Sequence, residues 1–267
     1  MPSFLPPTTL RSRVFLTITI LVTLIAVGLP LYFRVQGAGN PSVVVNKYFN
    51  SGTAAGDVVE LLVTQNNLDM RGMIIKDFSA SMVNDGGGKF QFSTNALWSS
   101  VPAGTLIVLR NNNTAADTTV GSGDFNLDVG LTNTTYFTSL GGAFDIAGVE
   151  MVMIKSAGSG AAGVTGSIHA LAGGTAGAQF TATAVPKLIA SGQSGTNQFV
   201  FANNSTQSIN DFDGTDATGA ATGLTFGAGN NANNTAYINS LRNGSNQAIA
   251  PSCPGSINTP QGTSDDD

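Results

Sequence analysis

Three aspartates within a short run are the strongest candidate for a ligand-binding site in this sequence. Asp211, Asp213 and Asp216 belong to NDFDGTD, which has a glycine between the second and the third aspartate. Ca²⁺ prefers several oxygen ligands, and closely spaced aspartates in a glycine-containing loop can supply them. The run lacks the D-x-D-x-D-G order of an EF-hand loop and has no bidentate glutamate downstream. It indicates either a Ca²⁺ site or a solvated turn capped by Asp side chains.

Asp57 and Glu60 form a second candidate, because paired carboxyl groups can act as acid and base. A glycosidase needs two such groups about 5–10 Å apart in a cleft. These two residues are three apart in a predicted strand, so their side chains point to opposite faces. They therefore do not form one short-range site.

Four other features favour structural roles. His169 has no neighbouring Ser or Cys that would complete a hydrolase signature, so it is interpreted as a satisfied histidine. The run Asn84–Lys89 (NDGGGK) lacks phosphate-loop spacing and predicts a tight turn with positive φ. Trp98 is interpreted as a core residue, although an exposed Trp could stack on a sugar. Cys253 is the only cysteine, which excludes an internal disulfide, and it is predicted to be a free thiol.

The composition indicates an all-β protein. The 267 residues include 33 glycines, only 10% charged residues and 42% hydrophobic residues. Many turn-forming residues disfavour long helices, and the apolar content suffices for a core. A net charge of −5 gives no basic surface for nucleic acid and disfavours electrostatic binding to anionic lipid.

Apolar and polar residues alternate with a period of two along several short stretches, which is typical of β-strands. In the second stretch Val59, Leu61 and Val63 share one face, which predicts a half-buried sheet. The first two stretches are predicted to form a hairpin. The predicted strands are 43–49, 57–63, 72–78, 89–92, 104–110, 125–131, 149–155, 166–171, 186–190 and 198–202.

The order of these stretches from Val43 to Leu109 resembles the lamin tail domain family in its bacterial, exported form. The matching runs are VVVNKYF, GDVVELLV, NLDMRGMIIKDF and PAGTLIVL, and TPQG near the end is similar to the family's closing motif. Met73 stands where the family usually has an aromatic residue, and Gln261 interrupts the closing Pro-Gly. The resemblance implies an immunoglobulin-like β-sandwich without catalytic residues. The family position of Glu60 implies that its side chain makes a structural hydrogen bond rather than acting as an acid or base. The matching positions are Asn46, Asp57, Glu60, Leu61, Leu68, Gly72, Asp77, Pro102 and Gly104.

Residues 1–38 are predicted to be an export segment. Arg11 and Arg13 precede an apolar run from Val14 to Phe33, and this arrangement directs the following chain out of the cytoplasm. The run fits a cleavable signal peptide with small residues near Gly37, and it is also long enough for a signal anchor. Export of a chain with no disulfide favours a bacterial source.

The remaining chain divides into a sandwich, 42–202, and a Gly/Asn-rich extension, 203–267. Most of the extension up to Asn234 is predicted to be a long loop. A short helix is predicted over 235–242, capped by Asn233 or Asn234 and ended by Gly244. The tail beyond Pro251 is predicted to be mobile.

These observations predict a non-enzymatic, exported module for binding or scaffolding at the cell surface or outside the cell. Its expected partner is an extracellular protein or glycan rather than nucleic acid, and membrane contact is expected only through an uncleaved N-terminal segment. Self-association through exposed edge strands is a further possibility. One alternative is a Ca²⁺-dependent carbohydrate-binding module that uses Asp211, Asp213 and Trp98. The other is a carboxylate-based hydrolase.

Overall fold

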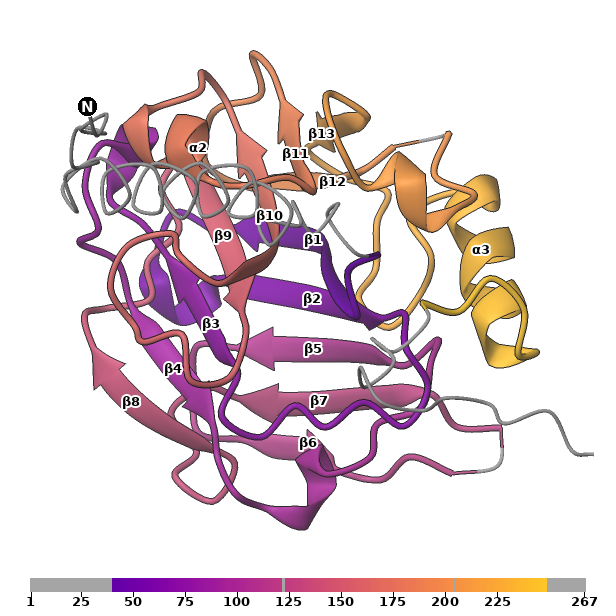
Figure 1. Ribbon diagram of the computed structural model, residues 1–267. Helices are drawn as coiled ribbons and strands as arrows, with labels where there is room; N and C mark the ends of the chain where they lie inside the picture. The colour runs from indigo at the N-terminus through magenta and orange to yellow at the C-terminus, as the bar shows by residue number, and fades with distance from the viewer. Residues whose placement is uncertain (1–39, 122, 204, 249–267) are drawn as a thin grey trace, which may run out of the picture. The chain divides into compact units, whose positions relative to one another are not determined.

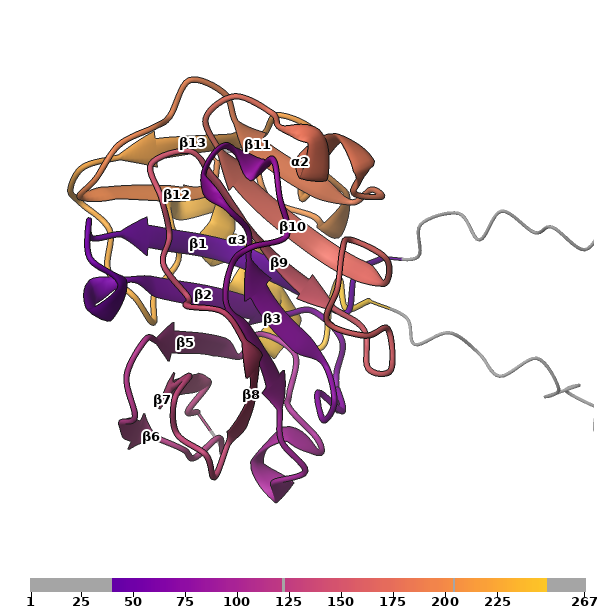
Figure 2. The same ribbon diagram turned by 90° about the vertical axis from the view of Figure 1, so that its left-hand side faces the viewer.

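The computed structural model describes residues 40–121, 123–203 and 205–248. They form an all-β sandwich of two sheets, as the sequence predicts (Figure 1 and Figure 2). A seven-stranded sheet has the order β13-β12-β1-β2-β5-β7-β6, and a six-stranded sheet has the order β11-β10-β9-β3-β4-β8. The predicted export segment and the tail that carries Cys253 lie outside the described residues.

The predicted strands are all present. The first two form the predicted antiparallel hairpin, and most other neighbours are antiparallel, while β5–β7 and β10–β11 are parallel pairs. The first sheet contains β1 (Val43–Asn50), β2 (Val58–Val63), β5 (Leu106–Arg110), β6 (Ala115–Asp117), β7 (Asn126–Gly130), β12 (Gln198–Ala202) and β13 (Ala217–Ala220). The second contains β3 (Ile74–Asp77), β4 (Lys89–Phe92), β8 (Phe137–Gly141), β9 (Glu150–Lys155), β10 (Ser167–Gly173) and β11 (Lys187–Ala190).

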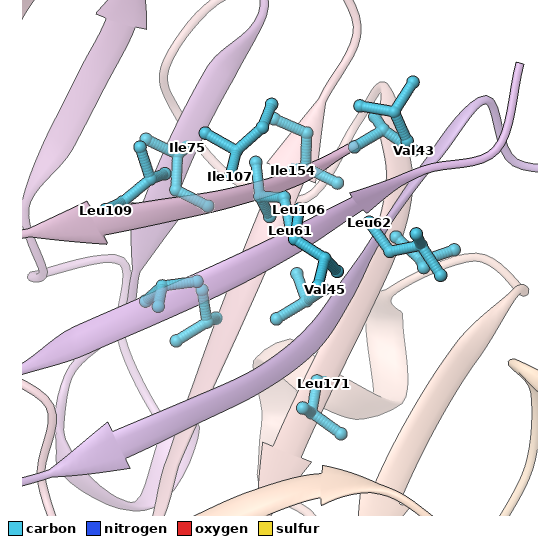
Figure 3. Packing of buried hydrophobic residues seen from close by; sticks show 14 of the residues in the cluster. Val43, Val45, Leu61, Leu62, Ile75, Leu106, Ile107, Leu109, Ile154 and Leu171 are labelled. Carbon is cyan, nitrogen blue, oxygen red and sulfur yellow. The ribbon is translucent and has the colours of Figure 1, made fainter. Parts of the chain in front are cut away.

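The main core lies between the two sheets. Val45, Leu61 and Ile107 of the first sheet meet Ile75 and Ile154 of the second in one continuous cluster (Figure 3). A smaller cluster covers the other face of the second sheet, where Phe78 and Met153 pack against Phe180 of helix α2 (Ala178–Ala182). Alternate side chains along β3 and β9 therefore belong to two separate apolar clusters, one on each face of the second sheet.

The central strands of the first sheet are buried on both faces, whereas the sequence predicts a half-buried sheet. Every residue of β2 is buried, because the predicted loop after Asn203 folds against the sheet. That segment contains β13, which pairs with β12, and helix α3 (Ala232–Arg242), which adds Tyr237 to the main core. The predicted helix is confirmed, but it begins three residues earlier.

Helix α3 is capped by Asn231, not by Asn233 or Asn234 as predicted. The side-chain oxygen of Asn231 accepts a hydrogen bond from the backbone N–H of Asn234 at 3.0 Å. The helix ends at Arg242, and Gly244 follows with φ of +80°, as expected for a glycine beyond a helix C-terminus.

A buried ion pair within the β1–β2 hairpin also forms hydrogen bonds to the extension. Lys47 Nζ lies 3.1 Å from Glu60 Oε1, and both side chains are 0% exposed. Glu60 also accepts hydrogen bonds from the Asn46 side chain at 2.9 Å and from Gly227 N at 2.7 Å. Lys47 Nζ donates to the carbonyls of Thr225 and Ala228 at 2.8 and 2.6 Å. The structural hydrogen bond predicted for Glu60 is therefore present.

A β-bulge explains why two consecutive side chains reach Glu60. The register of β1 against β2 shifts between Val45 and Lys47, so Asn46 has no partner residue on β2. Bulged residues re-aim side chains, and both Asn46 and Lys47 contact the glutamate here. Burial raises the pKa of Glu60 and lowers that of Lys47, while the attraction between the two groups opposes both shifts.

Glu60→Gln tests how much the fold depends on this pair. The amide keeps the shape of the side chain but leaves the Lys47 ammonium buried without a counter-charge, so we expect a loss of about 3–5 kcal/mol in unfolding free energy. Adding Lys47→Met removes the stranded charge and should recover part of that loss. Urea denaturation measures both effects, and a double variant no more stable than Glu60→Gln would contradict the explanation.

Candidate functional site

Three buried carboxyl groups hold one short segment of the chain. Asp77 Oδ2 accepts a hydrogen bond from Asp145 N at 2.9 Å, and Asp57 Oδ2 accepts one from Ile146 N at 2.6 Å. A longer bond of 3.4 Å joins Ala147 N to Glu150 Oε2. The backbone N–H groups of residues 145–147 have no partner in a strand ladder. Carboxyl side chains at the ends of three strands accept their hydrogen bonds instead.

The sheet register brings two of these acids together. Asp77 ends β3 opposite Val152 of β9, and Glu150 lies two residues from Val152 on the same face of that strand. Asp77 Oδ1 is buried and has no hydrogen-bond partner among the described residues. A Cβ atom on Gly87 would lie 2.3 Å from this oxygen, so only glycine fits there.

Burial changes the protonation of this pair. It raises the pKa of Asp77 to about 7 and that of Glu150 to about 8, and the nearby Asp77 carboxylate adds to the shift of Glu150. Burial also raises the pKa of Asp57, although hydrogen bonds from Ser51 and Ile146 oppose that shift. At neutral pH the pair therefore retains a proton, which reduces the repulsion between the two groups.

The segment held by the carboxyl groups continues into the wall of a cleft, which we call the inner cleft. The inner cleft has a volume of about 330 Å³ and opens where β4 and β8 meet the segments that follow β5 and β7. Its apolar lining comes from Phe90, Leu131, Phe137 and Phe144. Its polar lining comes from Asn111, Thr132, Thr134 and Ser139. No charged side chain of the described residues lines it.

The wall of the inner cleft is fixed from two sides. Asn111 Nδ2 donates hydrogen bonds to the carbonyls of Phe144 at 2.7 Å and Ala54 at 2.9 Å. A Cβ atom on Gly88 would lie 2.3 Å from Phe144 N, so the glycine permits close packing of two backbones. The sequence predicts a turn with positive φ here, but neither Gly87 nor Gly88 has a positive φ. Close packing is the reason for these two glycines.

A second depression, the outer groove, lies on the opposite face of the same two strands. Its volume is about 620 Å³, and its lining includes Gln91, Asn95, Thr135 and Thr138. Thr134 lines both the outer groove and the inner cleft. Among the described residues, the lining of the groove is also uncharged. Strand β8 therefore separates two neutral surfaces, one with an apolar floor and one rich in hydroxyl and amide groups.

The three aspartates of the predicted Ca²⁺ site serve the local turns. Asp211 Oδ2 accepts hydrogen bonds from the backbone N–H groups of Gln207 and Ser208, and Asp213 Oδ1 accepts from Lys187 N. Asp216 accepts a hydrogen bond from Ser205 Oγ. In the part of the chain that the structure describes, no three Asp, Glu, His or Cys residues gather as a metal site would require. Ca²⁺ binding by this loop remains a prediction.

Trp98 occupies the core position predicted for it, and His169 has the satisfied ring predicted for it. Trp98 is 0% exposed, packs edge-on against Phe92, and donates a hydrogen bond from Nε1 to Tyr136 O at 2.9 Å. It has no face free for a sugar. His169 Nδ1 accepts from Val45 N at 3.1 Å, and Nε2 lies 3.1 Å from Phe212 O. Burial lowers the pKa of His169 to about 4, so the ring is neutral at physiological pH.

The carboxyl groups of a possible hydrolase lie away from both depressions. Asp57 and Glu60 are buried and bond to different segments, as their predicted opposite orientation requires. Asp77 and Glu150 were not identified from the sequence, because single acids at the ends of apolar strands resemble ordinary surface residues. The only signal is their position in otherwise apolar runs, MIIKDF and VEMVMIK.

Buried lysines bind backbone carbonyls on the outside of the second sheet. Lys76 Nζ donates to Ala161 O and Gly163 O at 3.1 and 3.2 Å and contacts the Asp85 carboxylate. Lys155 Nζ donates to Ala162 O at 2.8 Å, and burial lowers its pKa to about 8. These bonds hold the glycine-rich loop around residues 161–163 against the outer face of the sheet. They explain why the two ammonium groups are buried beneath that loop.

Comparison with known proteins gives no family assignment: no protein-family model, no curated protein and no solved structure matches this chain. Among the described residues, no helix has the length and apolar character needed to cross a membrane. The lamin tail resemblance therefore stays a prediction.

Glu150→Gln tests the protonation of the buried pair. Because the folded-state pKa of about 8 exceeds the ordinary value, the folded protein holds a proton that the unfolded chain releases. The stability from this proton is full below about pH 4.5 and is lost as pH rises through about 8. We expect the loss of unfolding free energy between pH 5 and pH 8.5 to be roughly 2 kcal/mol smaller in Glu150→Gln.

Urea denaturation at several pH values measures this difference. Asp145→Asn is the matched control, since it removes an exposed carboxylate from the segment that the buried acids hold. His169 titrates in both proteins and cancels in the comparison. Equal pH dependence of the wild type and Glu150→Gln would show that Glu150 does not carry the proton.

Proposed function

We propose that this protein is an exported, non-enzymatic module for binding or scaffolding, built on an immunoglobulin-like sandwich of the lamin tail type. The observation that carries the binding role is the pair of neutral depressions on either side of β8. Ligand sites combine an apolar floor with a few polar groups that fix orientation, and the inner cleft has this composition. The export segment predicted from residues 1–38 supports a location outside the cytoplasm.

The chemistry of the lining favours an uncharged ligand. A charged ligand would lose hydration in the inner cleft without meeting a counter-charge among the described residues. Thr132, Thr134 and Ser139 are exposed and offer hydroxyl groups, while Phe90, Phe137 and Phe144 lie buried beneath them. A neutral ligand that accepts and donates hydrogen bonds, such as a sugar or an uncharged segment of an extracellular protein, matches this lining.

Thr134→Trp tests this assignment, because Thr134 is exposed and lines both depressions. The wild-type protein is applied to arrays of neutral oligosaccharides and of uncharged peptides, and retained ligands are then titrated by calorimetry. We expect the indole to obstruct the inner cleft and to weaken binding by roughly tenfold or more. Thr222→Trp, at an exposed position in the loop after β13, is the matched control.

The same experiment separates binding from catalysis. A binding module releases its ligand chemically unchanged, which mass spectrometry of the eluted ligand can establish. Ligand cleavage would support the hydrolase alternative. Binding that is lost equally in both variants, or kept in Thr134→Trp, would show that the cleft is not the binding site.

A further inference from the structure

The outer edge of β8 is the least protected sheet edge in the described part of the chain. β8 is an end strand of the second sheet, and four of its five residues are exposed. It contains neither a charged residue nor a proline. Natural sheets usually block their edges with such residues, with very short strands or with covering segments.

The other three end strands each have a feature that hinders pairing. β6 has three residues and ends with Asp117. β11 is covered by Gly214, which bonds to Lys187 O at 2.8 Å and to Ile189 N at 3.1 Å. β13 has four residues, none of them classed as exposed. Among these four end strands only β8 combines length, exposure and neutrality. Its ladder with β4 is regular up to Ser139 and shifts register before Gly141, which leaves Leu140 without a partner residue on β4.

The register shows which backbone groups of β8 face outward. Ser93 N donates to Tyr136 O at 2.9 Å, and the next pairs are Phe92–Phe137, Gln91–Thr138 and Phe90–Ser139. Hydrogen-bonded and non-bonded pairs alternate in an antiparallel ladder, so the N–H and C=O of Thr138 face β4. Those of Ser139 face away from it, and no other described segment bonds to them.

We propose that β8 pairs edge to edge with β8 of a second copy of this chain. Antiparallel pairing about a twofold axis at Ser139 would satisfy its outward N–H and C=O with the same groups of the partner copy. The two six-stranded sheets would then form one continuous sheet. Figure 1 shows β8 at the free margin of its sheet, beyond β4.

Charge and exposed apolar surface favour a second copy over an unrelated strand. Each chain has a net charge of −5, so most contacts between copies would be repulsive. The strand and both adjoining depressions are uncharged, which removes that repulsion at this edge. Leu140, one of the few large apolar side chains exposed in the described residues, lies on β8 at 39% exposure. It would be covered by the partner copy.

The pairing segment is short, so the dimer is expected to be weak and concentration-dependent. It does not rest on the proposed binding function, because it uses the backbone edge of β8 rather than the lining of the inner cleft. Dimer formation would bring the two inner clefts to neighbouring positions across the axis. A ligand with two attachment points could then bind both.

Sedimentation equilibrium of the full chain in density-matched detergent tests the proposal. We expect the wild type to dimerise over the micromolar range, and Leu140→Lys to weaken the dimer by roughly tenfold or more by placing like charges at the axis. Ala116→Lys, which adds the same charge to the exposed edge strand β6, should leave the dimer unchanged. Melting temperatures near that of the wild type establish that both variants fold.

A second pair of variants tests the backbone itself. Ser139→Pro removes the outward N–H and should weaken the dimer, whereas Ser139→Ala keeps the N–H and should not. A wild-type chain that stays monomeric through the millimolar range would overturn the proposal. It would equally be overturned if Leu140→Lys and Ala116→Lys had the same effect, because association would then come from another part of the chain.

Discussion

The buried carboxylate of Glu60 is the contact on which the arrangement of this molecule depends. It bonds to β1 through Asn46 and Lys47, and to the extension through Gly227. The extension is rich in glycine and asparagine, yet its few large apolar side chains enter the main core, among them Phe212, Tyr237 and Leu241. The polar network supplies directional contacts that place Tyr237 and its neighbours against the sheet. As a result, a segment with the composition of a loop becomes the second cover of a buried sheet.

The same chemistry recurs wherever a glycine-rich segment crosses a sheet. Such segments expose backbone N–H and C=O groups that no ladder satisfies, and burying them unpaired would be costly. Here Asp57, Asp77 and Glu150 accept from the N–H groups of residues 145–147, while Lys76 and Lys155 donate to the carbonyls of 161–163. Charged residues are only 10% of the chain. Because several of them lie inside, the surface around β8 remains neutral.

The sequence predicts most of the fold but little of the candidate site, for a physical reason. Strands such as β2 and β9 bury apolar side chains at fixed intervals, and that periodicity is visible in the residues themselves. β6 and β13 are short and made of small or polar residues, and β8 has its two large apolar residues, Phe137 and Leu140, three positions apart. None of the three therefore shows the apolar alternation of a strand. The run SLGGAFDIAG has the glycine and small residues typical of a turn, yet it includes the end of β8 and part of the wall of the inner cleft.

Individual residues show the same difference between what the sequence predicts and what it does not. Glu60 could be predicted to make a hydrogen bond, because a glutamate within an apolar strand has to find a partner when it is buried. Asp77 and Glu150 could not be paired from the sequence, since their proximity follows from the register of β3 against β9. The bulge at Asn46 is likewise absent from the apolar alternation. Contacts decided by one strand were predictable, and contacts decided by the register of two strands were not.

One short segment, residues 144–147, connects the buried carboxyl pair to the wall of the inner cleft. Phe144 forms part of the cleft wall, and the next three residues are held from behind by the buried acids. Ionisation of both Asp77 and Glu150 would place two like charges in a buried site. The segment that these groups hold carries the wall. The wall of the cleft is therefore held by carboxyl groups whose pKa burial raises, whereas the edge of β8 consists of backbone groups that do not titrate.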